Sequence, residues 1–144
     1  MKEDIIHLIK LNNKIFRTTQ VYLDKVLKKY ELSSGSYPYL LVLNENEGIS
    51  QNKISKELGF DKAMSARTVT KLINLGYLDR KEDEADSRAY KLYLTQKAKI
   101  IIPNVLNEIH KLEGLITNDL SEKEKVITLD SLNKILNNMK NFKL

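Results

Sequence analysis

The sequence predicts a mainly α-helical protein that carries one short two-stranded β-hairpin. Apolar residues recur at the helical spacing of three or four through most of the 144-residue chain. Between residues 77 and 94 this pattern changes to alternation, which is typical of strands. The length, with 42% apolar and 30% charged residues, matches one globular domain rather than a disordered chain.

The N-terminal part of the chain predicts two helices separated by a serine-rich break. Residues 4–30 are expected to form one long helix, because their apolar residues follow the helical period and neither Gly nor Pro interrupts it. Ser33 or Ser34 is expected to cap a second helix at about 35–46. Pro38 then falls in a first helical turn, where the missing N–H costs little.

Two short helices follow, over about 50–58 and 61–75. Ser50 and Asp61 are their expected N-caps, since each carries a side-chain oxygen for the unpaired N–H groups of the first turn. Gly59 ends the first of them. Two short helices joined by a tight turn that contains a glycine are typical of a helix-turn-helix.

A hairpin comes next, with strands at about 77–81 and 89–94 and a charged tip between them. A helix-turn-helix that is followed at once by a hairpin forms a winged-helix arrangement. The helical period then resumes over about 96–118 and 122–142. Ser121 and Glu124 have the spacing of a capping box at the start of the last helix.

The terminal helices have broad apolar faces, and the small winged core cannot cover all of them. We therefore expect a second copy of the chain to bury these faces. A monomer whose terminal helices pack on its own core is the alternative. The whole chain, 1–144, is predicted to be a single unit with a winged helix-turn-helix lobe at 33–96. The segments 1–32 and 97–144 are the predicted dimerisation helices.

Basic residues are concentrated in the middle of the chain. There are 24 Lys and Arg residues against 19 Asp and Glu residues, which gives a net charge of +5. Residues 50–99 contain 11 basic and 7 acidic residues and so account for +4 of this charge. The total alone does not demand an anionic partner, but its concentration in the winged segment favours one.

The second helix of the predicted helix-turn-helix has a face with cations, small residues and no acid. Arginine can hydrogen-bond guanine, a methyl group can contact thymine, and small residues allow close approach to a groove. An ordinary solvated surface is the alternative, and the adjoining turn and hairpin favour DNA. The residues predicted to contact DNA from this face are Lys62, Ala63, Ala66, Arg67, Thr70 and Lys71.

The preceding helix opens with polar side chains, which together with a helix N-terminus make good phosphate contacts. The residues predicted for this role are Ser50, Gln51, Asn52 and Lys53. Asp61 is expected to act as a cap rather than as a base contact.

Several classes of function are not predicted. The absence of cysteine excludes disulfides, thiol chemistry and Cys-ligated zinc. His7 and His110 lie on amphipathic helices and are expected to be solvated or interfacial rather than metal ligands. No Gly-rich phosphate loop or Ser–His–Asp set is found, so we expect neither an enzyme nor a cofactor or metal site. No apolar run could span a membrane and the start is too polar for a signal peptide, so we expect a cytoplasmic protein without a membrane partner.

A set of residues occurs here in the order and spacing of one known family. The set comprises Asp61 and Lys62, Arg67, Leu75-Gly76-Tyr77-Leu78, Arg80, Asp86 and Arg88, and Leu92-Tyr93-Leu94-Thr95. Over nearly its whole length the chain resembles the MarR family of winged helix-turn-helix transcriptional regulators. The resemblance implies a homodimer that binds a palindromic double-stranded DNA operator and acts as a repressor.

The resemblance also implies roles for the hairpin, or wing. Arg88 would enter the minor groove, and Asp86 would orient it through a charge-assisted hydrogen bond. Arg80 and Ser87 would be further DNA contacts of the wing. A surface ion pair is the alternative for Asp86 and Arg88. The chain has Ser65 where the family usually has an apolar core residue.

Members of this family commonly release DNA when a small aromatic or anionic ligand binds between the dimer helices and the winged lobe. Arg17, Tyr37 and Tyr39 are the candidate contacts for such an effector. A salt bridge is the alternative for Arg17, and core packing is the alternative for the two tyrosines. A chain without cysteine cannot use thiol oxidation, which leaves ligand binding as the expected switch.

A protein-interaction module that has the winged fold but no longer binds DNA is the second functional hypothesis. Such a module would not need the cationic face of the helix at 61–75, nor Arg88 in the wing. These two features therefore favour DNA binding.

Overall fold

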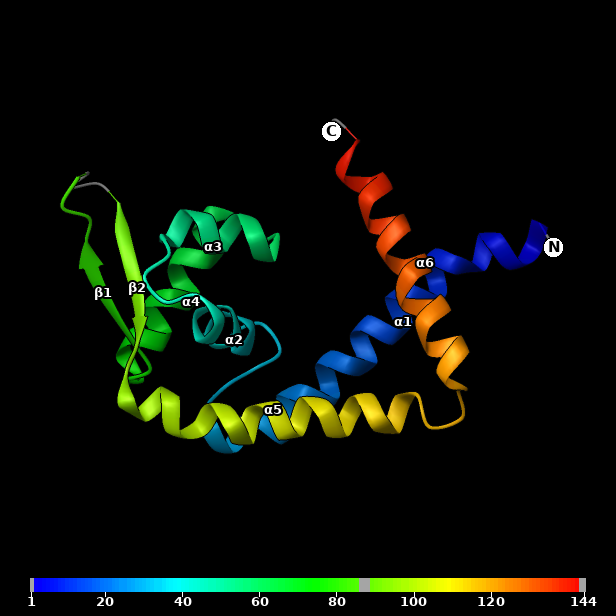
Figure 1. Cartoon of the computed structure of the whole chain (residues 1–144), viewed down its shortest axis with the longest axis horizontal. Helices are drawn as coiled ribbons and strands as arrows, with labels where there is room; N and C mark the ends of the chain where they lie inside the picture. Colours follow the sequence, from blue (N-terminus) through cyan, green and yellow to red (C-terminus); the bar gives the residue numbers. More distant parts are fainter. Residues whose placement is uncertain (1, 86–88, 143–144) are drawn as a thin grey trace. The chain divides into compact units, whose positions relative to one another are not determined.

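A computed structural model describes residues 2–85 and 89–142 of the protein (Figure 1). Within these residues the chain forms α1 (Lys2–Leu27), a 3-10 turn (Lys28–Tyr30), α2 (Tyr37–Glu45), α3 (Gln51–Leu58), α4 (Lys62–Asn74), β1 (Leu78–Glu82), β2 (Tyr90–Leu94), α5 (Gln96–Ile116) and α6 (Glu122–Lys140). This confirms the prediction of a mainly helical winged helix-turn-helix chain with a two-stranded wing.

The chain divides into two compact units, Met1–Glu108 and Ile109–Leu144. The boundary between them lies within α5.

The 3-10 turn that continues from α1 ends where Glu31 adopts a left-handed backbone conformation with φ of 59°. The N–H of Leu32 then donates to the carbonyl of Leu27 at 3.2 Å, which pairs one of the carbonyls left open at the helix end. Leu23, Leu27 and Leu32 are buried, so the C-terminal end of α1 is anchored in the core.

The start of α2 differs from the sequence prediction. Ser36, and neither Ser33 nor Ser34, occupies the N-cap position, and its side chain makes no capping hydrogen bond. Its hydroxyl instead accepts from the N–H of Ser33 at 2.9 Å and lies 3.2 Å from the Ser33 hydroxyl. The serines therefore stabilise the turn before the helix. Pro38 lies in the first turn of α2, as predicted.

Helices α2, α3 and α4 gather beside the hairpin of β1 and β2 (Figure 1). The strands are antiparallel, with Leu78 opposite Leu94 and Arg80 opposite Leu92. Leu78, Leu92 and Leu94 are buried, because alternate residues of a strand face the same side. The hairpin thus contributes one apolar face to the core of the lobe.

A short extended segment before α3 pairs with the other edge of β2. The N–H of Gly48 donates to the carbonyl of Leu92 at 2.8 Å, and the N–H of Leu92 donates to the carbonyl of Ile49 at 3.0 Å. Gly48 has a φ of 82°, and a Cβ there would lie 3.3 Å from the Tyr93 hydroxyl oxygen. A glycine is therefore favoured both by the backbone conformation and by the close approach of Tyr93.

The polypeptide between α4 and β1 is held by side chains from the start of α5. The Thr95 hydroxyl donates to the carbonyl of Gly76 at 2.6 Å, and the Lys97 ammonium donates to the carbonyl of Leu75 at 2.6 Å. The Tyr77 hydroxyl donates to the carbonyl of Tyr30 at 2.7 Å. Burial raises the pKa of Tyr77, which keeps this hydroxyl protonated as a donor.

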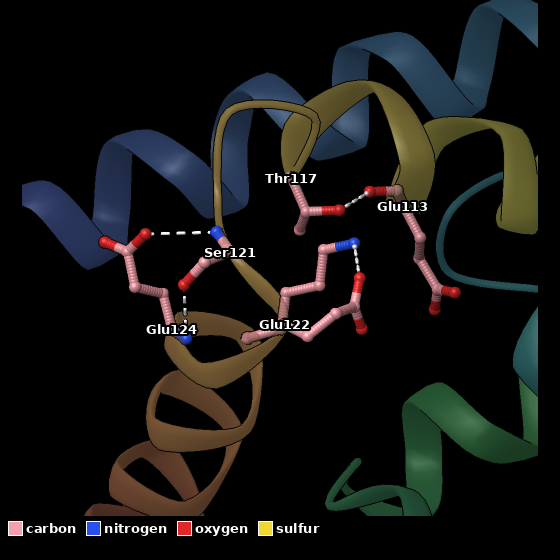
Figure 2. A network of polar contacts seen from close by, with 6 residues as sticks. Glu113, Thr117, Ser121, Glu122 and Glu124 are labelled. Carbon is pink, nitrogen blue, oxygen red and sulfur yellow. Dashed lines mark hydrogen bonds and ion pairs between the residues drawn. The ribbon is translucent and has the colours of Figure 1, made fainter.

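The turn before α6 contains the predicted capping box, which Figure 2 shows from close by. The Ser121 hydroxyl accepts from the N–H of Glu124 at 3.1 Å, and the Glu124 carboxylate accepts from the N–H of Ser121 at 3.0 Å. The hydrogen bond from the Ser121 N–H lowers the pKa of Glu124 below its ordinary value of 4.5. The start of α6 is thus fixed by local contacts.

No helix among residues 2–85 and 89–142 is both long enough and apolar enough to cross a membrane.

The capping box predicts a pH-dependent contribution to stability. A lowered carboxyl pKa means that the contribution is present above the ordinary pKa and is lost as the pH falls through the folded-state pKa. Glu124→Gln keeps a side-chain acceptor but cannot ionise. We expect this variant to have a lower Tm than the wild type at neutral pH, and the difference to shrink well below pH 4.5. Circular dichroism melts across this pH range measure it.

Glu122→Gln is the matched control, because it removes the same charge from the same helical turn without touching the capping box. Its Tm should differ less from the wild type at neutral pH. A Tm difference for Glu124→Gln that does not change with pH would contradict the assignment.

Candidate nucleic-acid interface

The two helices of the helix-turn-helix begin and end as the sequence predicts. The Ser50 side chain accepts from the N–H of Lys53 at 3.1 Å, and the Asp61 carboxylate accepts from the N–H of Met64 at 2.7 Å. Gly59 ends α3 with a φ of 73°, a conformation that glycine adopts without strain. The turn between α3 and α4 is therefore specified locally at both of its ends.

Helix α4 has two contrasting faces. Ser65, Val69 and Leu72 are fully buried and share one side of the helix. Of the predicted DNA-contacting residues, Ala63, Ala66, Arg67, Thr70 and Lys71 lie on the opposite side, while Lys62 lies in the first turn, close to the buried side. Five of them, Lys62, Ala63, Arg67, Thr70 and Lys71, are exposed, and Ala66 is half-buried. Arg67 and Lys71 thus lie on one open face that carries no acidic residue, and Lys62 adds a third exposed cation at the start of the helix, as an anionic groove would require.

The N-terminus of α3 carries the predicted phosphate contacts. Asn52 and Lys53 are exposed, and Ser50 and Gln51 are half-buried. A backbone bridge pairs Ser50 with Lys91 of β2, so the start of α3 lies directly beside the second strand of the wing. The side-chain carbonyl oxygen of Gln51 is buried and has no hydrogen-bond partner among the described residues.

The wing carries two cations that lie over aromatic rings. The Arg80 guanidinium is 4.4 Å from the centre of the Tyr90 ring, and the Lys81 ammonium is 4.9 Å from the centre of the Tyr93 ring. Such cation–π contacts favour particular positions of long and otherwise mobile side chains. The predicted contact Arg80 is therefore exposed but held against the strand.

The other predicted wing contacts, Asp86, Ser87 and Arg88, lie outside the described residues.

The candidate effector contacts lie in different environments. Arg17 is exposed on α1 and lines an open hollow with four other residues of that helix, Ile9, Lys10, Asn13 and Lys14. Tyr37 is half-buried at the first residue of α2. Tyr39 has no exposed surface, and its hydroxyl shares a hydrogen bond of 2.6 Å with the Ser65 hydroxyl. In this structure Tyr39 is a core residue rather than the wall of a cleft.

Sequence reasoning did not single out Lys81, Tyr90 and Lys91 as parts of this surface. The pairing of Glu82 with Tyr90 places Tyr90 on the same face of the hairpin as Arg80, whereas the pairing of Lys81 with Lys91 places these two lysines on the other face. The strand register could have found them, since cross-strand neighbours on one face interact. The register itself depends on where the two strands begin and end, which the sequence pattern alone does not determine.

Among residues 2–85 and 89–142, no group of three or more His, Asp or Glu side chains is placed so that it could hold a metal ion.

Known proteins that are similar in sequence include transcriptional regulators of the helix-turn-helix type. The sequence profile of the MarR family matches residues 30–89. The HTH-type transcriptional regulator BilQ of Clostridioides difficile (strain CD3) is 34% identical to this chain over 105 residues, which cover 73% of this chain and 71% of the relative.

Solved structures share the architecture. The MarR protein from Peptoclostridium difficile DA00132 superposes with a TM-score of 0.91 at 27% identity, over 94% of this chain and 88% of that one. MepR of S. aureus, solved as a complex with DNA, superposes with a TM-score of 0.86 over 91% of this chain and 97% of that one. The two sequences are only 20% identical, so this match shows a similarity of fold alone.

Proposed function

Because the chain belongs to the MarR family of transcriptional regulators, we propose that it is a homodimeric, sequence-specific double-stranded DNA-binding protein that represses transcription from a palindromic operator. The exposed basic face of α4 carries this proposal. Arg67 and Lys71 lie on that face and Lys62 is exposed at the start of the helix, while the opposite face of the helix is held in the core. A face of this kind suits the anionic major groove.

The proposed contacts divide into those that read bases and those that hold phosphates. Arg67 lies at the middle of the exposed face of α4 and can reach guanine, while Ala63 and Ala66 allow the helix backbone close to the bases. Lys62, Lys71 and the polar start of α3 would contact phosphates on either side.

The wing would contact the flanking minor groove. Arg80 supports this part of the proposal because it is exposed at the middle of β1 and held over Tyr90. We extend the contact to Asp86, Ser87 and Arg88 on the strength of the sequence motif. An arginine is favoured in a narrow A·T-rich minor groove by its enhanced negative potential.

The exposed apolar side chains support the proposed dimer. Large apolar residues that are at least half exposed occur on α1 and α6, where contiguous apolar surface marks an interaction site. Those on α1 include Ile9, Leu11, Ile15, Phe16 and Val21, and those on α6 include Val126, Ile127, Leu129, Leu136 and Met139. A twofold dimer would present two copies of α4 about 34 Å apart, which matches successive major grooves.

A small aromatic or anionic effector is the proposed release signal. Arg17 supports this because it is exposed on α1 one helical turn from the exposed Lys14, so the two side chains offer positive charge to an anion. Tyr37 remains a candidate contact from the start of α2.

Substitution of the central arginine tests the DNA proposal. Arg67→Ala removes a base contact and should weaken binding to a duplex from the protein's own upstream region by about tenfold or more. The wild-type affinity should fall steeply as salt rises, because bound phosphates release counterions. Gel shifts over a salt series measure both effects.

Lys123→Ala on α6 is the control, since this exposed lysine lies outside the winged lobe. It should leave the affinity unchanged. A wild-type protein that shows no salt-dependent binding to any duplex would favour the protein-interaction module instead.

The dimer is tested by its mass in solution. Sedimentation equilibrium should give about twice the chain mass of 16.7 kDa. Leu132→Asp places a charge on the apolar face of α6 and should shift the protein toward the monomer, because a carboxylate is costly to bury. Asp130→Asn, on the same helix, is the control. A wild-type protein that stays monomeric at micromolar concentration would rule out the dimer.

The effector proposal predicts that aromatic carboxylates such as benzoate or salicylate release the DNA complex in the same gel shifts. Arg17→Ala should reduce this release without weakening DNA binding itself. Retention of the complex at millimolar concentrations of these acids would count against an effector of this class.

A further inference from the structure

A buried polar contact joins α2 to α4, the helix that we propose recognises DNA. The hydroxyl oxygens of Tyr39 and Ser65 lie 2.6 Å apart, and neither residue has any exposed surface. Burial removes water as an alternative partner, so each hydroxyl depends on the other for its hydrogen bond.

The surroundings of this hydroxyl pair are apolar. Ser65 lies in line with Val69 and Leu72, which are also fully buried. The Tyr39 ring stacks against Phe60 of the turn before α4, with ring centres 6.0 Å apart and planes 18° apart. Tyr39 therefore contacts both the turn and the recognition helix.

The two kinds of contact constrain α4 differently. Apolar burial is non-directional, so it holds the helix in the core while allowing small rotations and slides. A hydrogen bond weakens steeply when its angle is distorted, so the pair of Tyr39 and Ser65 is satisfied over a narrow range of helix rotation.

Rotation of α4 matters because its exposed face would read DNA. Ala66 and Arg67 directly follow Ser65 in the helix. A side chain about 5 Å from the helix axis moves by about 2 Å when the helix turns by about 20°. Hydrogen bonds to base edges span a donor–acceptor range of only about 0.5 Å, so such a movement would break them.

We propose that Tyr39 and Ser65 are a positioning pair that sets the rotation of α4 and so determines how well the protein distinguishes its operator from other DNA. The inference rests on the proposed function. Flexible lysines can follow phosphates through a small rotation, whereas bidentate contacts to bases cannot. Loss of the pair should therefore reduce discrimination more than it reduces affinity for DNA in general.

A double-substitution cycle tests the pair. The variants are Tyr39→Phe, Ser65→Ala and the two combined. The probes are a duplex that the wild type selects from a random pool and a scrambled duplex of the same composition. Each single variant should lose stability, because it leaves one buried hydroxyl without a partner, and the combined variant should recover most of it.

Discrimination between the two duplexes should not recover in the combined variant, although stability should. The ratio of affinities for the selected and the scrambled duplex should fall about tenfold in each single variant. It should stay low in the combined variant, because that variant has no unpaired hydroxyl but also no directional contact. Urea unfolding and competition gel shifts on the same samples measure the two quantities.

Ser36→Ala is the matched control. Ser36 is also a buried serine whose hydroxyl is hydrogen-bonded, but its contacts are with Ser33 in the turn before α2. This variant should lose stability without changing the ratio of affinities.

Two outcomes would overturn the inference. One is recovery of the affinity ratio together with stability in the combined variant, which would give the pair a structural role only. The other is an unchanged ratio in the single variants. If one single variant does not fold, the other single variant and the combined variant decide between these outcomes. A wild type that selects no duplex would instead overturn the proposed function.

Discussion

The two faces of α4 set the constraint on which the rest of the lobe depends. A helix that presents Arg67 and Lys71 to an anionic partner cannot bury them, because charged groups lose their hydration in the core. Its position must therefore come from the opposite face, where Ser65, Val69 and Leu72 are fully buried. Helix α2, helix α3 and strand β1 all serve to receive this face. One side of α4 would therefore bind DNA, while the other side packs in the core of the lobe.

The base of the wing is held close to the C-terminal end of α4 by hydrogen bonds. Gly76, in a left-handed conformation, ends the passage from α4 into β1, and its carbonyl accepts a hydrogen bond from the Thr95 hydroxyl. Lys97 adds a hydrogen bond to the carbonyl of Leu75. The hairpin is thus joined to α4 through backbone carbonyls at its base, while cation–π contacts order Arg80 farther out. The two elements proposed to contact DNA, α4 and the wing, are consequently linked through the hydrogen-bonded segment at Leu75 and Gly76.

Local signals predicted the helices, the hairpin and the caps at Ser50, Asp61 and Ser121, because capping and periodicity depend on residues a few positions apart. Contacts between distant residues were not predictable in this way. The start of α2 was placed wrongly because the serines of the break bond to one another rather than to the helix. Tyr39 and Ser65 are 26 residues apart, and no local pattern indicates that their hydroxyls meet. The polar Ser65 is tolerated in the core because Tyr39 supplies a hydrogen-bond partner for its hydroxyl.

The positive charge and the exposed apolar surface lie in different parts of the chain. Residues 50–99 carry +4 of the net charge of +5, so the terminal segments are nearly neutral. Near-neutral helices with exposed apolar faces can approach a second copy without strong repulsion. The capping box at Ser121 and Glu124 fixes the start of α6 by local contacts, so this helix has support that does not depend on burial of its apolar face. A dimer built on these helices would carry its positive charge on two winged lobes, which is where an anionic duplex requires it.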